Sequence, residues 1–308
     1  MSTSTPDELT RVYAELSSTG FVERLLELAR DEDLGPGRCD LTSELFIDAN
    51  ATLRCAVVAR QPGVVSGLAA IAEMLRVFGF MDDIQVQIES SDGSPVEPQT
   101  RVAILEGKTR AILTLERTLL NLVGRLSGVA TQTRRFVEAM GTDTRAGLYD
   151  TRKTTPGLRV LEKYAVRCGG GKSHRIGLHD AVMVKDNHLA GLGLDDLGDA
   201  IKAAGERVRA ASGPIAFFEV EVDSLEQFER VLSVGGVDIV LLDNFSPALL
   251  REAVAMRDRV RPGLELEASG GITLETVREI ALTGVDRISV GGLTHSAVSL
   301  DFGLDALA

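Results

Sequence analysis

Residues 217–244 read FFEVEVDSLEQFERVLSVGGVDIVLLDN, and this stretch decides the fold. An apolar run at 217–222 is followed by the helical pattern SLEQFERVL and then by a second apolar run at 239–242. A strand, a helix and a strand in this order predict two parallel strands joined by a crossover helix, because parallel neighbours cannot be joined by a tight turn. The stretch therefore predicts an α/β fold.

The same alternation continues on both sides of this stretch. Further apolar runs occur at 146–149, 182–184, 264–268 and 288–290, and helical patterns such as LRVLEKYAVR, PALLREAVAMRD and LETVREIAL lie between them. Repeated strand–helix units that run in one direction predict a parallel sheet, either closed as a barrel or doubly wound. Spacing alone does not choose between these two.

The chain before this region has a different pattern. Its first helix is indicated by Thr5 as a cap, Pro6 at the first helical position and Glu8 three residues after the cap. An alternating strand at 53–59, the helix-like SGLAAIAEMLRVF and two further strand candidates complete an α+β module. With 308 residues in all, the chain is long enough for two domains.

A long helical pattern covers residues 108–140, and a break is expected near Gly124 or Gly128. On its first half the apolar residues face one way, whereas Arg117 faces another. The simplest interpretation of Arg117 is a cation in a surface salt bridge.

The overall composition excludes several classes of function. The 33 Lys and Arg residues against 45 Asp and Glu residues give a net charge of -12, which argues against binding to nucleic acid or to an anionic membrane. No charge-free apolar stretch approaches the length of a membrane span, and the first 30 residues are unlike a signal peptide, so a cytoplasmic protein is expected. The three cysteines, Cys39, Cys55 and Cys168, are widely spaced and indicate neither a disulfide framework nor a zinc site.

Positive charge is concentrated in one segment. Residues 150–188 contain eight basic and four acidic residues, a local charge of +4, together with three of the four histidines. A solvated basic face would account for the charge alone, but the positions of these residues after predicted strands point to a site.

Each apolar run ends at residues that can take part in chemistry. In a β/α barrel the active site forms at the carboxyl ends of the strands, so six such endings in succession predict an active site. In chain order the endings are Asp150, Arg152 and Lys153; Lys185, Asp186, Asn187 and His188; Glu219, Glu221 and Asp223; Asp243 and Asn244; Ser269, Gly270 and Gly271; and, after Val290, Gly291 and Gly292.

The endings differ in the ligand that they favour. The paired glycine-rich endings ASGG and VGG resemble the phosphate site of many barrels, where backbone N–H groups approach the ligand. Glu221 and Asp243 supply hard oxygen ligands that suit Mg²⁺ shared with a phosphorylated substrate, although either could instead pair with Lys153 or Lys185. No P-loop, dinucleotide fingerprint or GxSxG nucleophile motif is present in the sequence.

The first two endings form a cationic pocket with His174 and Arg175 of the loop GGGKSHR. Arginine binds carboxylate or phosphate groups bidentately. Several arginines that converge therefore predict a substrate with several negative charges.

At this point a family resemblance is evident. The segment DTRKTTPGLRVLEKYAVRCGGGKSHRIGLHDAVMVKDNH resembles the core signature of the quinolinate phosphoribosyltransferases, and so do ERTLLNLVGRLSGVAT, ARQPGVVSG, EVEVDSLEQ, LLDNF, EASGGI and VGGLTHS. One departure is Ser173, where the family usually has Asn. The resemblance implies an N-terminal α/β sandwich at 1–128, with 294–308 packing back on it, and an incompletely closed α/β barrel at 129–293, as in type II phosphoribosyltransferases.

The resemblance also implies the reaction. Quinolinate and 5-phosphoribosyl pyrophosphate would give nicotinate mononucleotide, pyrophosphate and CO₂ on the route to NAD. The resemblance further implies a homodimer, in which Arg117 of the partner subunit would reach into the site. Whether dimers assemble further is left open.

Residue roles follow from the same resemblance, position by position. Quinolinate would be held by Arg117, Thr151, Arg152, His174, Arg175 and Lys185. The sugar donor would be bound by Lys153, by Glu221 and Asp243 with Mg²⁺ held directly or through water, and by the phosphate-binding residues Ser269, Gly270, Gly271, Val290, Gly291 and Gly292. Lys153, Lys185, Glu221 and Asp243 would be the catalytic groups.

Two other functions remain to be distinguished. A related phosphoribosyltransferase acting on a ring with one carboxylate would need fewer cations than Arg117, Arg152, Arg175 and Lys185. A non-catalytic protein that binds phosphorylated metabolites would not need Lys153, Glu221 and Asp243.

Overall fold

The computed structural model describes residues 5–307, and within them the chain divides into two compact units. The first unit comprises the described residues up to Arg134, the segment Thr154–Gly170 and the described residues from Leu293 onward. The second unit comprises Arg135–Lys153 and Gly171–Gly292.

This division differs from the predicted domains, because residues 129–134, 154–170 and 293 fall within the predicted barrel but lie in the first unit; 154–170 is the longest of these segments. The segment forms α6 (Arg159–Cys168), which packs on the helix α1 (Pro6–Ser17). The Tyr164 ring meets the Tyr13 ring edge-on at 5.3 Å between centroids, and the Tyr164 hydroxyl donates to Asp92 at 2.8 Å. These contacts tie α6 to residues distant in the sequence, which the local pattern does not reveal.

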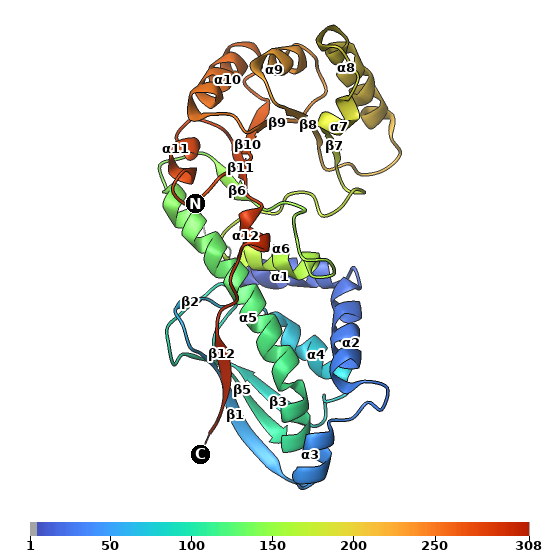
Figure 1. The fold of residues 1–308 in the computed structure, drawn as a ribbon, viewed down its shortest axis with the longest axis vertical. Coiled ribbons are helices and arrows are strands. Elements are labelled where there is room, and N and C mark those ends of the chain that lie inside the picture. Colours follow the sequence, from blue (N-terminus) through green and yellow to red (C-terminus); the bar gives the residue numbers. More distant parts are fainter. Residues whose placement is uncertain (1–4, 308) are drawn as a thin grey trace. The chain divides into compact units, whose positions relative to one another are not determined.

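The first unit is built on an antiparallel four-stranded sheet (Figure 1). Its strands, in spatial order, are β12 (Phe302–Ala306), β1 (Thr52–Ala59), β5 (Arg101–Lys108) and β3 (Ile84–Ile88). The C-terminal strand β12 pairs with β1, so the end of the described chain returns to the first unit, as predicted for this segment.

Helices surround this sheet, and α1 begins where the sequence predicts. Glu8 N–H donates to the Thr5 hydroxyl at 3.3 Å, and Pro6 occupies the first turn. The other helices and short elements of the unit are α2 (Phe21–Leu34), α3 (Leu41–Phe46), η1 (Leu68–Ala70), α4 (Ile71–Phe78), β2 (Gly63–Val64) and β4 (Pro95–Val96).

The predicted break in the long helix is wrong, because α5 (Thr109–Met140) runs without interruption through Gly124 and Gly128. A Cβ atom at Gly124 would lie 2.7 Å from the Leu300 carbonyl oxygen, and one at Gly128 would clash with the Val298 carbonyl. The Leu300 N–H donates to the Gly124 carbonyl at 2.9 Å. Both glycines therefore allow a segment from the end of the chain to approach the helix closely, and they do not end it.

The second unit is an all-parallel six-stranded sheet. Its strands, in spatial order, are β6 (Gly147–Tyr149), β11 (Arg287–Ser289), β10 (Glu265–Ser269), β9 (Ile239–Asp243), β8 (Phe218–Val222) and β7 (Val182–Val184). Within residues 5–307 the edge strands β6 and β7 do not pair with each other, so the sheet stays open. The predicted α/β fold, with a separate N-terminal sheet and a C-terminal parallel sheet, is confirmed.

Crossover helices connect the strands, and Figure 1 shows α8, α9 and α10 along the sheet. Serine caps start two of them: Gln227 N–H donates to Ser224 ahead of α9, and Leu249 N–H donates to Ser246 ahead of α10. The helices are α7 (Asp186–Leu189), α8 (Leu194–Ala210), α9 (Leu225–Leu232), α10 (Pro247–Val260) and α11 (Val277–Ala281). The short α12 (Gly292–His295) follows the last strand of the sheet and leads into the first unit. No helix within the described part of the chain is long and apolar enough to cross a membrane.

The pairing register separates the two faces of this sheet. Val220, Val240 and Leu242 are fully buried and alternate along their strands with Glu219, Glu221 and Asp243. Successive side chains of a strand project from opposite faces, so one face is apolar and the other carries the charged groups. The charged face is the one that carries the predicted site.

Candidate active site

Residues at the carboxyl ends of neighbouring strands share one face of the parallel sheet. Asp243 pairs with Ser269, and Glu221 pairs with Leu241, which is two residues before Asp243. Paired residues in a parallel sheet project from the same face, and so do residues two apart in a strand. The structure therefore brings the predicted residues Glu221, Asp243 and Ser269 to one edge of one face.

Lys185, which follows β7, joins this group through an ion pair. Its Nζ lies 2.5 Å from the Glu221 carboxylate, whose side chain is only 13% exposed. The alternative left open by the sequence, in which a carboxylate pairs with a lysine, is therefore realised for Glu221. A ligand that binds Glu221 must compete with Lys185 or share its charge.

Glu221 and Asp243 retain the chemistry that Mg²⁺ requires. The two carboxylates lie on adjacent strands, and the hydrogen bonds described for each involve only one oxygen. Glu221 accepts from Lys185, and Asp243 accepts from the Asn244 amide at 2.8 Å. Hard oxygen donors that leave room for water and substrate phosphates are typical of Mg²⁺ sites. The residues fit the ion.

The loop after β6 holds Thr151, Arg152 and Lys153. The Lys153 N–H donates to the Thr151 hydroxyl at 3.0 Å, which closes a short turn directly after the strand. Arg152 is partly buried, and its Nε is a buried donor with no hydrogen-bond acceptor among the described residues. A buried guanidinium nitrogen of this kind suits an incoming anion.

The loop that carries His174 and Arg175 is held by side chains, with no helix or strand of its own. Four successive N–H groups find side-chain acceptors within 2.7–2.8 Å. His174 N–H donates to Asp150, Arg175 N–H donates to the His174 ring at Nδ1, and the N–H groups of residues 176 and 177 donate to Asp180. The main chain around Arg175 is therefore fixed before any ligand binds.

Asp180 is an ionised acceptor in this loop. Burial alone would raise the pKa of its carboxyl group, but the N–H groups of Ile176 and Gly177 outweigh burial and lower it. The carboxylate is therefore fully charged at neutral pH.

Arg175 is held in an environment that concentrates positive charge. Its side chain is buried, and burial together with the nearby charge of Arg152 lowers the pKa of its guanidinium below the usual value. Two arginines held close in a partly dehydrated region are stabilised by a ligand with more than one negative charge. The structure thus buries the predicted cationic side chains Arg152, in part, and Arg175.

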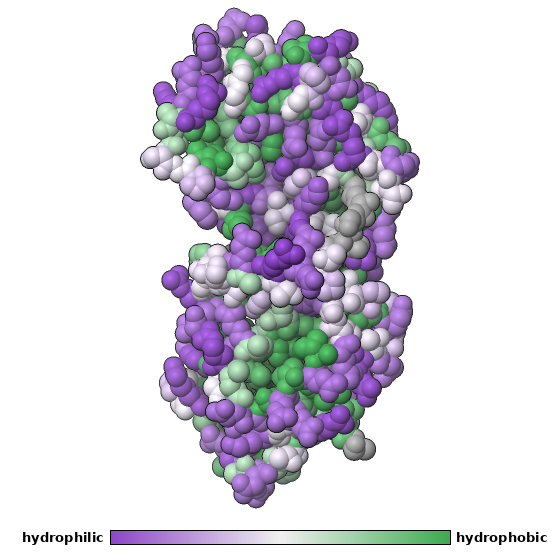
Figure 2. Space-filling model, turned by 180° about the vertical axis from the view of Figure 1, so that it is seen from behind, coloured by the Kyte–Doolittle hydropathy of each residue, from purple (hydrophilic) through white to green (hydrophobic). Residues whose placement is uncertain are grey.

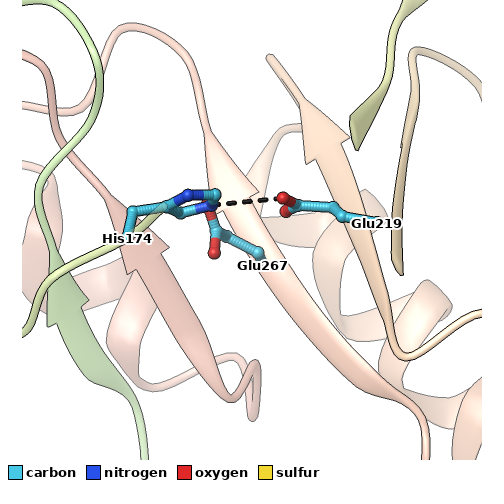
Figure 3. A group of neighbouring side chains, drawn as sticks. All are labelled: His174, Glu219 and Glu267. Atoms are coloured by element: carbon cyan, nitrogen blue, oxygen red, sulfur yellow. Dashed lines mark ion pairs between the residues drawn. The ribbon is translucent and has the colours of Figure 1, made fainter. Parts of the chain in front are cut away.

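A buried cluster contains His174 and Glu219, which the sequence singled out, together with Glu267 and Arg287, which it did not. His174 Nε2 lies 3.2 Å from Glu219 Oε2 and 3.4 Å from Glu267 Oε1, and both glutamates are fully buried (Figure 3). Arg287 Nε donates to Glu267 at 2.7 Å, and its guanidinium lies 3.8 Å from the centre of the Tyr149 ring. The glutamates alternate with apolar residues inside the strand patterns EVEV and ELEA, and this alternation was the available signal.

The charges in this cluster are strongly coupled. Burial and the neighbouring Glu267 carboxylate raise the pKa of Glu219. Burial lowers the pKa of the His174 imidazole, but the two carboxylates outweigh burial and raise it to about 9. The raised pKa favours a second ring proton, but that proton would have to sit on Nδ1, which accepts the Arg175 N–H. The two effects conflict, and we assign the ring from its hydrogen bond, with one hydrogen on Nε2.

The same hydrogen bond decides whether the cluster could hold a metal. His174, Glu219 and Glu267 place possible ligand atoms within 4.8 Å of one another. Coordination through Nε2 would move the ring hydrogen to Nδ1, where it would face the Arg175 N–H. We therefore interpret the cluster as a hydrogen-bonded and ionic network.

The glycine-rich strand ends form a second part of the site. Gly270 has a φ of +92°, and a Cβ there would lie 2.9 Å from the Asn244 nitrogen, so only glycine fits beside the end of β9. The Asn244 N–H donates to the Ser269 carbonyl at 2.9 Å, and the Val290 N–H donates to the Tyr149 carbonyl at 3.0 Å. The predicted phosphate-binding residues therefore lie at or directly after the carboxyl ends of two neighbouring strands, β10 and β11.

Arg117 lies in the first unit, on α5, apart in the chain from the other predicted residues. Its side chain is 67% exposed, and the nearest carboxylate, Glu116, lies 4.0 Å away. It borders a cavity of about 360 Å³. The cavity is lined by Asp33, Leu34, Cys39, Asp40, Leu41, Thr42, Leu113, Thr114 and Arg117.

Comparisons with known proteins agree over nearly the whole chain. Residues 40–127 match the family model "Quinolinate phosphoribosyl transferase, N-terminal domain", and residues 129–305 match the model of the C-terminal domain. The nicotinate-nucleotide pyrophosphorylase [carboxylating] of Mycobacterium leprae is 44% identical over 278 residues, which cover 90% of this chain and 94% of that protein. A probable enzyme of the same name from Bacillus subtilis is 41% identical, covering 89% of each chain.

Solved structures show the same similarity. The nicotinate-nucleotide pyrophosphorylase of Francisella tularensis superposes with a TM-score of 0.82 at 35% identity, covering 94% of this chain and 96% of that one. The NadC structure from Streptococcus pyogenes gives a TM-score of 0.82 at 36% identity, covering 93% and 97%.

Proposed function

The chain belongs to the quinolinate phosphoribosyltransferase family, and on that premise we propose which of its residues carry out the conversion of quinolinate to nicotinate mononucleotide. The protein is a pentosyltransferase of NAD biosynthesis. Its substrates are quinolinate and 5-phosphoribosyl pyrophosphate, and its products are nicotinate mononucleotide, pyrophosphate and CO₂. The observation that carries the residue assignment is the burial of two guanidinium groups in the loops of the site: Arg175 is buried, and Arg152 Nε is a buried donor with no acceptor among the described residues.

Quinolinate is a dianion, and the cationic pocket suits it. We assign its carboxylates to Arg152, Arg175 and Lys185, with Thr151 and His174 beside them. The support is the buried guanidinium donor of Arg152, the buried Arg175 and the position of Lys185 next to Glu221 on the same face. Bidentate arginine contacts would fix the plane of the pyridine ring and aim its nitrogen.

The sugar donor would lie along the remaining strand ends. Lys153 would neutralise pyrophosphate, and the turns at Ser269, Gly270 and Gly271 and at Val290, Gly291 and Gly292 would offer N–H groups to the 5-phosphate. Glu221 and Asp243 would face the ribose and hold Mg²⁺, which when bound neutralises charge on the pyrophosphate. The support is that Glu221 and Asp243 share one face of the sheet and that the hydrogen bonds described for each carboxylate involve only one of its oxygens.

The order of bond changes follows from the chemistry of the substrates. The pyridine nitrogen attacks the anomeric carbon as the bond to pyrophosphate breaks, and no general base is needed because that nitrogen has no proton to lose. Glu221 and Asp243 place negative charge beside the electron-poor sugar. The ring nitrogen is now cationic, so the C2–carboxylate bond breaks with loss of CO₂, and C2 keeps the electron pair until it takes up a proton.

We further propose a homodimer in which Arg117 of the partner subunit completes the quinolinate site. The support is an exposed cation without a close partner on α5, beside exposed apolar side chains of α3. Leu41, Leu45 and Phe46 are 66%, 86% and 84% exposed. Figure 2 shows an area of hydrophobic residues on one face of the first unit, as expected of a surface that another subunit covers.

A cytoplasmic location is proposed as well. All three cysteines are free thiols, two of them buried, which is typical of a reducing compartment.

The experiment that tests the site measures steady-state kinetics of Arg152→Ala and Lys185→Ala with quinolinate. Each should lower kcat/KM by the equivalent of about 2 to 5 kcal/mol, because each leaves a buried substrate charge unpaired. Release of CO₂ from quinolinate, with no nucleotide formed from nicotinate, should accompany wild-type turnover. Arg230→Ala, which removes an exposed arginine paired with Asp195, is the matched control. Near-normal kcat/KM in either site variant would reject the assignment.

A further inference from the structure

The main chain at Arg175 depends on the neighbouring imidazole. Arg175 N–H donates to His174 Nδ1 at 2.8 Å, and both residues are buried. The orientation of the ring therefore sets the position of the backbone from which the Arg175 side chain extends.

The ring itself is held from its other side. Nε2 lies between Glu219 on β8 and Glu267 on β10, at 3.2 and 3.4 Å, and the Phe217 ring meets the imidazole edge-on at 5.3 Å. Figure 3 shows the two carboxylates converging on the same nitrogen. With contacts on both nitrogens and on its edge, the imidazole has one favoured orientation.

Glu267 is in turn held by Arg287. Its Oε2 accepts from Arg287 Nε at 2.7 Å, while Glu265 lies 3.4 Å from the other end of the same guanidinium. The guanidinium lies over the Tyr149 ring at 3.8 Å, which fixes its plane. A chain of contacts thus runs from β11 through β10 to the loop that carries Arg175.

We propose that Glu267 and Arg287 are positioning residues for quinolinate: through His174 they fix the loop from which Arg175 binds a substrate carboxylate. Neither residue touches the substrate in this scheme. The inference rests on the proposed role of Arg175.

This series of contacts differs from an ordinary buried ion pair because loosening it should affect the binding of one substrate. Binding groups must be held within a fraction of an ångström, so a loosened support weakens the affinity for one substrate while the fold persists. Quinolinate binding should suffer, whereas binding of the sugar donor at the other strand ends should not.

The experiment compares Glu267→Gln and Arg287→Lys with Arg175→Ala and with the double variant Glu267→Gln/Arg175→Ala. KM values for quinolinate and for 5-phosphoribosyl pyrophosphate are measured separately, and quinolinate affinity is also measured by calorimetry. We expect Glu267→Gln to raise the KM for quinolinate about tenfold with little change in the KM for the sugar donor. Because Glu267 acts through Arg175, the double variant should lose no more than Arg175→Ala alone.

The matched control is Arg257→Lys. Arg257 is almost fully buried, and it pairs with Asp286 at 2.6 Å, at the opposite ends of the strands. It should lower the unfolding temperature and leave both KM values unchanged. Arg287→Lys retains the positive charge, so it provides the test of the inference if Glu267→Gln fails to fold.

The outcomes distinguish the proposed role of Arg175 from the positioning role of Glu267 and Arg287. An unchanged KM for quinolinate in Arg175→Ala would overturn the proposed role of Arg175 and this inference with it. A raised KM in Arg175→Ala together with an unchanged KM in Glu267→Gln and Arg287→Lys would overturn the inference alone. Equal effects on both substrates, or additive losses in the double variant, would also overturn it.

Discussion

Asp180 closes the loop that carries Arg175, and its two oxygens accept hydrogen bonds from the N–H groups of Ile176 and Gly177. Both bonds are short and involve a charged acceptor, the kind that contributes most to stability. A single side chain therefore replaces the hydrogen bonds that a helix or strand would give this segment.

Asp180→Asn should lower the free energy of unfolding by about 2 kcal/mol, because an amide can accept from one N–H group but not from both. The pKa of Asp180 is lowered in the folded protein, so its contribution is full above the usual carboxyl pKa and is lost as the pH falls through the lowered value. Urea unfolding at pH 7 and at pH 3 measures both effects. Asp195→Asn is the control, since the Asp195 side chain is 95% exposed and should change stability by less than about 0.5 kcal/mol. Equal unfolding free energies for the two variants at pH 7 would contradict this account.

Glycine is required at one position of α5 but not at a position of α8, as the space around Gly128 and Gly198 shows. Gly128 faces the Val298 carbonyl with no room for a side chain. Gly198 in α8 has its nearest neighbour, a Val234 methyl group, at 3.6 Å from a built Cβ, an ordinary contact distance.

Gly128→Ala should therefore destabilise the protein by about 1 to 3 kcal/mol, the usual cost of overpacking. Gly198→Ala should stabilise it by about 0.5 to 1 kcal/mol, because alanine has the higher helix propensity and meets no clash. Chemical denaturation of the two variants gives both values. Stabilisation by Gly128→Ala would show that the segment from Val298 to Leu300 does not lie against α5.

The sequence predicts where helices and strands lie better than it predicts which distant segments contact them. The strand–helix repeats and the cap at Thr5 are local patterns, and they were predictable because the forces that form them act over a few residues. The break near Gly124 was wrong because its partner, Leu300, lies far along the chain. Glu267 and Arg287 were missed for a similar reason, because only the folded sheet brings them near each other and near His174.

At the scale of the whole molecule, the predicted site residues are divided between the two units. Arg117 belongs to the first unit, and Arg152, Arg175 and Lys185 belong to the second. A homodimer would supply the missing cation from another copy of the chain, and each dimer would then contain two sites built from two chains.

Mixing two inactive variants tests this arrangement. Arg117→Ala and Arg152→Ala homodimers should both have low activity, because each site lacks one cation. In a heterodimer, one site carries both substitutions and the other carries neither, so the isolated heterodimer should have about one half of the activity of the wild-type dimer. Exchange is followed with two affinity tags, and activity is measured on the doubly tagged species. A mixture of Arg152→Ala and Lys185→Ala, both in the second unit, is the control and should show no recovery. Absence of recovery in verified Arg117→Ala/Arg152→Ala heterodimers would place Arg117 outside the site.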